Sequence, residues 1–282
     1  MNEISAPIRL FFGVTLVAAS FVAYLGLFVP EQLDEKFTWV ELPPLHARFV
    51  GVLYLFGAVY MIGSILARRW SQVSPTLPAI AIFTSLLLLV TLLNLEAFDF
   101  DLGPVWVWTL SYIILPTVAL GLLWTARNRD VPPVQGPAVA PWARTFLRAQ
   151  AGVFALLGIL LLVARGVMVD VWPWPISEGL AQFYGGPFLA YAFCSWQYSG
   201  RRTWAELAVL APAGLTLTAG TVIVSLMHDE LFSTSDLATW VWFVGFGVAS
   251  VAWLAITAMS VSASLADRAA MTAPVEPGPA AA

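Results

Sequence analysis

The chain has 282 residues, of which 60% are apolar and only 11% are charged. Soluble domains carry roughly 25% charged residues, so this composition excludes an ordinary soluble domain and is typical of a protein embedded in lipid. The mean hydropathy of +0.82 agrees with that conclusion. A net charge of −4 gives no reason to expect a nucleic-acid partner, and the single cysteine, Cys194, excludes an intrachain disulfide and a metal–thiolate motif.

Eight stretches along the chain are long and apolar enough to cross a hydrocarbon layer about 30 Å thick. They cover residues 8–29, 44–66, 78–97, 105–125, 144–164, 181–199, 205–227 and 237–262. The first stretch is longer than the apolar core of a cleaved signal peptide, which has roughly 7–15 residues, so we expect it to be retained as a helix. The predicted fold class is all-α: a polytopic membrane protein with eight transmembrane helices.

The connections between these stretches alternate between arginine-rich and acidic. Ten of the thirteen basic residues lie near the two ends of the chain or in the second, fourth and sixth connections, and most acidic residues lie in the others. Because Lys and Arg in short loops stay on the cytoplasmic side, both termini should be cytoplasmic. The high arginine and alanine content suggests a bacterial protein, so the predicted location is the cytoplasmic (inner) membrane, with several crossings.

A duplication is indicated by the tripeptide Trp-Val-Trp, which begins at Trp106 and again at Trp240. We call the offset between these two positions the repeat shift. It aligns further segments in the same order: Thr91–Asn94 with Ser225–His228, Phe98 with Phe232, and Arg68-Arg69 nearly with Arg201-Arg202. Each copy would hold four helices, an even number, so both copies would have the same orientation. This predicts two parallel four-helix repeats related by a pseudo-two-fold axis along the membrane normal.

The predicted division of the chain follows from this duplication. The first four-helix repeat covers residues 1–130, a cytoplasmic Pro-rich linker covers 131–141, and the second repeat covers 142–266. Residues 267–282 are rich in alanine and proline, which is typical of disorder, so a disordered cytoplasmic tail is expected there.

The two Trp-Val-Trp segments would lie at the external ends of the fourth and eighth spans. Tryptophan prefers the membrane interface, where its ring is half in lipid and its N–H stays hydrated. Residues two apart on a helix point about 200° away from each other, so one ring of each pair can face lipid while the other faces the helix bundle. The rings either form an aromatic belt or, on the inner side, line an external cavity.

The centres of the spans hold no charged residue, which argues against a midplane proton relay or a voltage sensor. They do hold hydroxyl groups on one face of the third and seventh spans. These stripes consist of Thr84, Thr91 and Asn94, and of Thr218, Thr221, Ser225 and His228. Their hydroxyls either bond to their own helix and hold neighbouring helices together, or they form a polar track leading inward from the outside.

Ten residues are predicted to contact a ligand in a cavity on the external side between the repeats. The polar contacts would be His46, Arg48, Asn94, Glu96, Arg165 and His228, and the walls would be Trp106, Trp108, Trp240 and Trp242. No catalytic or metal-binding residue is predicted, because the HExxH, GxSxG, P-loop and dinucleotide motifs are absent. The sequence therefore gives little support for an enzyme.

The leading functional hypothesis is a membrane protein that binds or translocates a small molecule, amphiphilic or not, through this aromatic-rimmed cavity. Arg48 and Arg165 would pair with an anionic head group or neutralise Glu96 and Asp170. The first alternative is a structural or assembly subunit, with membrane lipid and other membrane subunits as partners. The second is a haem-binding electron carrier, with His46 and His228 as axial ligands, or another metal site at these histidines.

Overall fold

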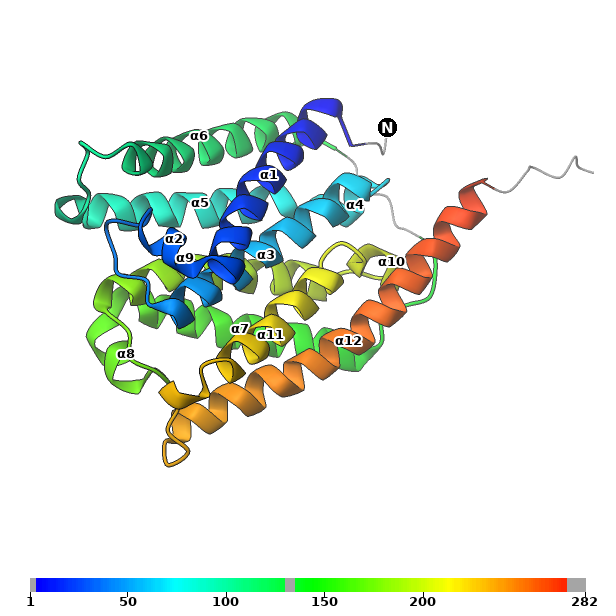
Figure 1. The fold of residues 1–282 in the computed structure, drawn as a ribbon. Coiled ribbons are helices and arrows are strands. Elements are labelled where there is room, and N and C mark those ends of the chain that lie inside the picture. The colour runs from blue at the N-terminus through cyan, green and yellow to red at the C-terminus, as the bar shows by residue number, and fades with distance from the viewer. Residues whose placement is uncertain (1–3, 130–134, 273–282) are drawn as a thin grey trace, which may run out of the picture.

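A computed structural model describes residues 4–129 and 135–272. All regular elements of the described chain are helices, and it contains no strand; an isolated bridge between Ala138 and Thr203 is its β-type contact. The long helices form an elongated bundle, and the first and last helices of the described chain begin and end at the same end of the molecule (Figure 1).

The first half of the chain contains four long helices joined by short ones. The long helices are α1 (Ala6–Phe28), α3 (Pro44–Leu66), α5 (Thr76–Leu93) and α6 (Gly103–Ala126). The short ones are α2 (Pro30–Asp34), α4 (Trp70–Val73) and the 3₁₀ turn η1 (Leu95–Ala97). Prolines stand in the first turn of α1, α3 and α6, where the missing backbone N–H costs no helical hydrogen bond.

The second half follows the same order of long and short helices. The long helices are α7 (Pro141–Val163), α9 (Glu178–Ser199), α11 (Ala211–Leu226) and α12 (Leu237–Thr272). The short ones are α8 (Arg165–Val171), α10 (Trp204–Leu207) and η2 (Asp229–Leu231). The repeat shift places the first residue of α4 on that of α10, and the first residue of η1 on that of η2.

The described residues include only part of the expected linker and of the expected tail. The prediction of disorder from residue 267 was wrong for residues 267–272, which continue α12; Asp267 there forms an ion pair with Arg69 at 2.8 Å. The rest of the expected tail, 273–282, lies outside the described residues, as do 131–134 of the expected linker. The described part of the linker bonds to the connection after α9, where Val139 N donates to Arg202 O at 3.0 Å.

Six of the described helical segments are long and apolar enough to cross a membrane. They are Ala6–Phe28, Pro44–Leu66, Trp70–Leu93, Gly103–Ala126, Pro141–Val163 and Leu237–Ala269. The chain is therefore a multi-pass helical membrane protein. The other two expected spans correspond to α9, most of which is buried among other helices, and to α11, which has only 16 residues.

The helices pack in pairs, and the pairs join the two halves. α1 packs along α3, α5 along α6, α7 along α9, and α11 along α12. Between the halves, α3 packs against α11 and α5 packs against α9. Within each half the backbones of the two pairs come close at few places, mainly between α1 and α6 or between α7 and α12. The halves therefore interlock through α3, α5, α9 and α11, and neither packs as a separate bundle.

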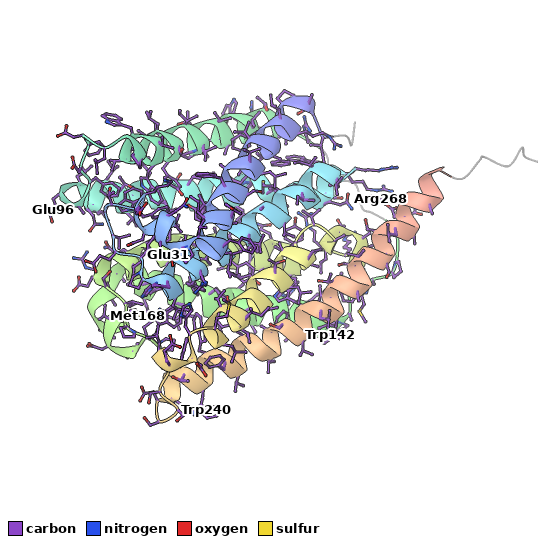
Figure 2. All side chains as sticks on the ribbon, viewed as in Figure 1. Glu31, Glu96, Trp142, Met168, Trp240 and Arg268 are labelled. Carbon is purple, nitrogen blue, oxygen red and sulfur yellow. The ribbon has the colours of Figure 1, made fainter. Side chains whose placement is uncertain are left out.

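The two ends of the bundle differ in charge. Glu31 and Glu96 lie at one end and Arg268 at the other (Figure 2). We call the end that holds α8, η1 and η2 the acidic end, and the end that holds α4, α10 and both ends of the described chain the basic end (Figure 1). Arginines at the basic end bond to helix termini: Arg9 to the Ala67 carbonyl at 3.0 Å and Arg268 to the Leu66 carbonyl at 3.1 Å.

Candidate ligand cavity and the polar contacts at the acidic end

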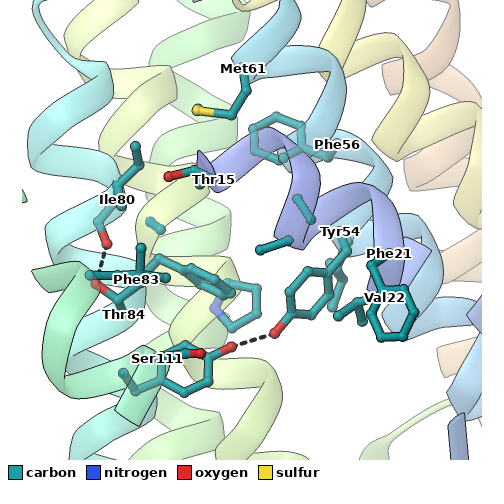
Figure 3. A pocket seen from close by; sticks show the side chains of 18 of the residues that line it. Thr15, Phe21, Val22, Tyr54, Phe56, Met61, Ile80, Phe83, Thr84 and Ser111 are labelled. Carbon is teal, nitrogen blue, oxygen red and sulfur yellow. Dashed lines mark hydrogen bonds between the residues drawn. The ribbon is translucent and has the colours of Figure 1, made fainter. Parts of the chain in front are cut away.

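A cavity of about 660 Å³ lies among α1, α3, α5 and α6 and one face of α9. Small-molecule pockets have roughly 300–1,000 Å³, so the space is large enough for such a ligand. The side chains that Figure 3 draws around it are mainly apolar, among them Phe21, Phe56 and Ile80. The predicted cavity was to lie between the two halves; this one is built mostly by the first half.

The cavity is empty next to Gly57, whereas the corresponding position in the second half of the chain, Tyr191, holds an aromatic ring. Tyr54, Gly57 and Tyr112 line the cavity. The residues that the repeat shift pairs with these three are all aromatic: Phe188, Tyr191 and Phe246. These three rings surround Phe154, with ring centroids 5.0, 4.8 and 6.1 Å from it. The space around Phe154 is thus filled with aromatic rings.

The cavity opens sideways between α1 and α6. Val17 and Phe21 of α1 and Val107 of α6 line it and are also exposed on the outer surface of the molecule. Lipid covers the outer surface of a membrane protein, so the opening faces hydrocarbon. Lys36, the only lysine in the sequence, also lines the cavity, in the connection between α2 and α3 at the acidic end.

Three hydroxyl groups on the cavity wall bond to their own helices. Thr15, Thr84 and Ser111 each donate to the carbonyl oxygen four residues earlier, at 2.9, 2.7 and 2.6 Å. Such bonds satisfy the hydroxyl without a partner on another helix. These hydroxyls therefore have no hydrogen left to donate to a ligand.

The cavity wall nearest the basic end carries a chain of hydrogen bonds. The Tyr198 hydroxyl donates to the Gln72 carbonyl at 2.6 Å and accepts from the Tyr60 hydroxyl at 3.3 Å. The Cys194 thiol, 3.9 Å away, donates to the Tyr60 oxygen. Because the chain ends on a backbone carbonyl, all three side chains have an acceptor.

Tyr54 and Tyr112 differ from the other hydroxyl residues of the cavity. Tyr54 on α3 points into the cavity (Figure 3), and its hydroxyl bonds to that of Tyr112 on α6. Both rings pack against Phe83, with centroids 5.9 and 6.3 Å from it. This pair links the α1–α3 side of the cavity to the α5–α6 side.

Arg48 and His228, two of the predicted polar contacts, lie together at the acidic end. Arg48 Nη1 is 2.5 Å from His228 Nε2, and His228 Nδ1 is 3.5 Å from Glu230 Oε1. An arginine only donates, so His228 Nε2 accepts in this bond. The contact joins α3 of the first half to the end of α11 in the second.

The corresponding contact at the repeat-related positions joins α5 of the first half to α9 of the second half. Asn94, at the end of α5, donates from Nδ2 to Gln182 Oε1 of α9 at 2.8 Å. The repeat shift pairs Asn94 with His228 and Arg48 with Gln182. Sequence reasoning missed Gln182, although the same shift applied to Arg48 points to it.

The other predicted polar contacts lie apart from these pairs. His46 bonds through Nδ1 to the Tyr184 hydroxyl and through Nε2 to the Pro175 carbonyl, both at 2.9 Å. Arg165 forms an ion pair with Glu178 at 2.6 Å, and Glu96 is exposed in η1. None of the six predicted polar residues is among the residues that line the cavity, so their role as ligand contacts stays a prediction.

The four tryptophans that were predicted to line the cavity form one exposed pair and one buried pair. Trp106 and Trp240 are 49% and 55% exposed, whereas Trp108 and Trp242 are 8% and 7% exposed. The buried rings donate to stripe hydroxyls, Trp108 to Thr91 at 2.9 Å and Trp242 to Ser225 at 3.0 Å. Of the four, Trp108 lines the cavity.

An aromatic cluster surrounds each buried tryptophan. Trp39 lies 4.5 Å from Trp108 and Trp174 lies 4.8 Å from Trp242, between ring centroids. Each cluster also takes one ring from the other half: Phe183 at 5.8 Å from Trp108 and Phe49 at 5.7 Å from Trp242. Aromatic rings exchanged in this way hold the two halves together near the acidic end.

Most hydroxyl groups of the two stripes donate hydrogen bonds within the helices that carry them. Thr91, Thr218 and Thr221 donate to carbonyls four residues earlier, as Thr84 does, and Thr91 and Ser225 also accept from tryptophan. This matches the interpretation in which the hydroxyls bond to their own helix and hold neighbouring helices, and it leaves no continuous polar track along the described residues of the two stripes.

No protein-family model, no curated protein and no solved structure matches this chain. Among residues 4–129 and 135–272, no three His, Cys, Asp or Glu side chains are grouped so that they could hold a metal ion.

Proposed function

We propose that all eight long helices cross the membrane as two parallel four-helix repeats, with the basic end and both termini in the cytoplasm. The repeat is supported by contacts that recur at positions related by the repeat shift: Trp108 with Thr91 and Trp242 with Ser225, and Asn94 with Gln182 and His228 with Arg48. The orientation is supported by the arginines at the basic end, because Lys and Arg in short loops stay cytoplasmic. A bacterial inner membrane stays the predicted location.

In this framework the protein binds a small amphiphilic molecule that enters from the lipid between α1 and α6. The observation that carries this proposal is the cavity of about 660 Å³, lined by apolar groups and open on a surface that lipid covers. Pockets that bind small molecules are mostly apolar with a few polar groups that orient the ligand. The membrane itself would supply the ligand.

Lys36 supports a ligand with an anionic head group. Three basic residues lie toward the acidic end: Lys36, Arg48 and Arg165. Arg48 bonds to His228 and Arg165 pairs with Glu178, whereas the Lys36 ammonium has no ion-pair partner among the described residues. Lys36 also lines the cavity, so its charge can meet a head group while the apolar body of the ligand lies inside.

Binding fits the cavity better than translocation. The residues toward its basic end, Tyr60, Met61 and Ala79, are only 3%, 2% and 5% exposed, so the cavity is closed there. The hydrogen-bonded chain of Cys194, Tyr60 and Tyr198 adds a further barrier behind them. A transported molecule would have to break this packing.

The haem alternative conflicts with the positions of the two histidines. Both ring nitrogens of His46 have hydrogen-bond partners. Residues two apart on a helix point about 200° away from each other, so His46 points away from the side on which Arg48 meets His228. The two imidazoles therefore do not face a common iron site. No contact among the described residues specifically favours the alternative of an assembly subunit.

A photoactivatable fatty acid tests the binding proposal in protein reconstituted into liposomes. The probe should label cavity residues such as Tyr54 and Tyr112, detected by mass spectrometry of the digested protein. Gly57→Leu should reduce this labelling to background, because Gly57 lines the cavity and a leucine there would fill part of it next to Ala19 of α1, whose Cβ would lie 3.8 Å from the new Cβ.

Gly121→Leu is the matched control. It makes the same change on the exposed side of α6, where a Cβ meets nothing within 4 Å, and should leave labelling of the two tyrosines unchanged. Equal labelling of wild type and Gly57→Leu at these tyrosines would rule out the cavity as the binding site.

A further inference from the structure

The hydroxyl groups of Tyr54 and Tyr112 form the polar feature of the cavity that the binding proposal leaves unexplained. Two tyrosine hydroxyls carry two hydrogens, and the bond between them uses one. Neither hydroxyl has a second partner among the described residues. One hydrogen of the pair is therefore left without an acceptor inside an apolar cavity.

The other hydroxyl and thiol groups on the cavity wall do not share this property. Thr15, Thr84 and Ser111 donate to their own helices. Tyr60 and Cys194 donate within the chain that ends on Gln72, and Tyr191 donates to Gln150 Oε1 at 3.1 Å. The tyrosine pair thus offers the unpaired hydroxyl donor of the cavity, and a buried donor without an acceptor carries a cost of about 1–3 kcal/mol.

Helix packing does not require these hydroxyls. The residues that the repeat shift pairs with them are Phe188 and Phe246, which occupy buried positions in α9 and α12 without any hydroxyl group. Both phenylalanines pack on Phe154, as Tyr54 and Tyr112 pack on Phe83. The hydroxyls occur in the half of the chain that has the open cavity.

The depth of the pair limits what it can bind. Tyr54 lies about 15 Å along α3 from its start at the acidic end, at a rise of 1.5 Å per residue, which is near the middle of a hydrocarbon layer about 30 Å thick. Lys36 lies at the end of the cavity near the membrane surface. A single ligand that reaches both would carry its charge at one end and a polar atom partway along its apolar body.

We infer that the Tyr54–Tyr112 pair selects amphiphiles that carry a carbonyl oxygen in the middle of the apolar body, which accepts the free hydroxyl hydrogen. This inference rests on the proposed binding function and names the class of ligand. A carbonyl oxygen only accepts, so it matches a donor that lacks an acceptor. A plain acyl chain would leave the donor unpaired and should bind less tightly.

Equilibrium binding of two anionic probes tests this selection: stearate and the same acid with a mid-chain ketone. Wild-type protein in nanodiscs should bind the keto acid about three- to tenfold more tightly, as expected for one net hydrogen bond. Tyr54→Phe and Tyr112→Phe should each keep the preference, because one hydroxyl remains to donate. The double variant should bind stearate more tightly than the keto acid, since a carbonyl without a donor is costly to bury.

A keto acid with its ketone near the methyl end is the control ligand, and the wild type should bind it no better than stearate. The selection is refuted if the double variant keeps the wild-type preference for the keto acid, or if the wild type shows no such preference. In either case, binding of stearate would still support the proposed function. If neither acid binds to any variant or to the wild type, the proposed function is refuted and the selection with it.

Discussion

Gly26 and Gly51 bring α1 and α3 into backbone contact in the first half of the chain. A Cβ on Gly26 would overlap the Ala47 carbonyl oxygen and lie 2.7 Å from Gly51 Cα. Gly158 and Gly185 make the corresponding crossing of α7 and α9, where a Cβ on Gly185 would lie 3.0 Å from the Gly158 carbonyl oxygen. Small residues at such crossings let membrane helices approach closely enough to pack through their backbones.

Gly26→Ala should destabilise the protein by about 1–3 kcal/mol, because the added methyl group has to displace backbone atoms of α3. Gly13→Ala, on the same helix at a place where a Cβ meets nothing within 4 Å, should be neutral or stabilise by up to about 1 kcal/mol through helix propensity. Thermal unfolding in detergent, followed by tryptophan fluorescence, measures both. Equal midpoints for the two variants would show that the crossing is not close.

At the scale of elements, α12 is the longest helix of the described chain and its two faces differ. Trp253 is fully buried and packs flat against α11, where a Cβ on Gly214 would lie 2.5 Å from the indole ring. The next residue, Leu254, is exposed on the lipid side. The small residue Gly214 on α11 thus leaves room for the large ring of Trp253 on α12, as small residues do at contacts between membrane helices.

Trp253→Ala should lower the unfolding free energy by about 3–5 kcal/mol, because it leaves a large void between α11 and α12. Leu254→Ala removes an apolar side chain that touches lipid and should change stability by less than about 0.5 kcal/mol. Denaturant unfolding in mixed micelles compares the two. A small loss for Trp253→Ala would mean that α12 is not anchored on α11 by this ring.

At the scale of the whole molecule, α11 decides how many times the chain crosses the membrane. With 16 residues it is shorter than the roughly 20 that a spanning helix needs, yet it packs in the centre of the bundle against α3 and α12. The connections on its two sides differ in charge, Arg201 and Arg202 before it and Asp229 and Glu230 after it. We expect α11, together with α10 and η2 at its ends, to separate the two sides of the membrane.

A membrane-impermeant maleimide tests that separation in cells that express single-cysteine variants. In a Cys194→Ser background, Ser233→Cys after η2 should react in intact cells, and Gly200→Cys before α10 should react only after permeabilisation. Both sites are exposed, so reactivity reports the side of the membrane rather than burial. Reaction of both variants in intact cells would mean that α11 does not cross, and the reverse pattern would invert the proposed orientation.

Much of the helical framework could be predicted from local sequence. The apolar stretches matched the positions of the eight long helices, although the end of α5, the start of α11 and the end of α12 were missed by several residues. Apolar length is a local property, and a helix satisfies its own backbone hydrogen bonds, so no distant residue is needed to define it. The burial of Trp108 and exposure of Trp106 likewise follow from helix periodicity.

The cavity and its polar contacts depended on the tertiary structure. Arg48 and His228 are 180 residues apart, and Tyr54 and Tyr112 are 58 apart on helices that do not follow each other in the chain. Composition and hydropathy determined that this chain is a helical membrane protein with one basic and one acidic set of connections. Only the packing of α1, α3, α5, α6 and α9 decided where space remains, because a void is set by the combined volumes of side chains from separate helices.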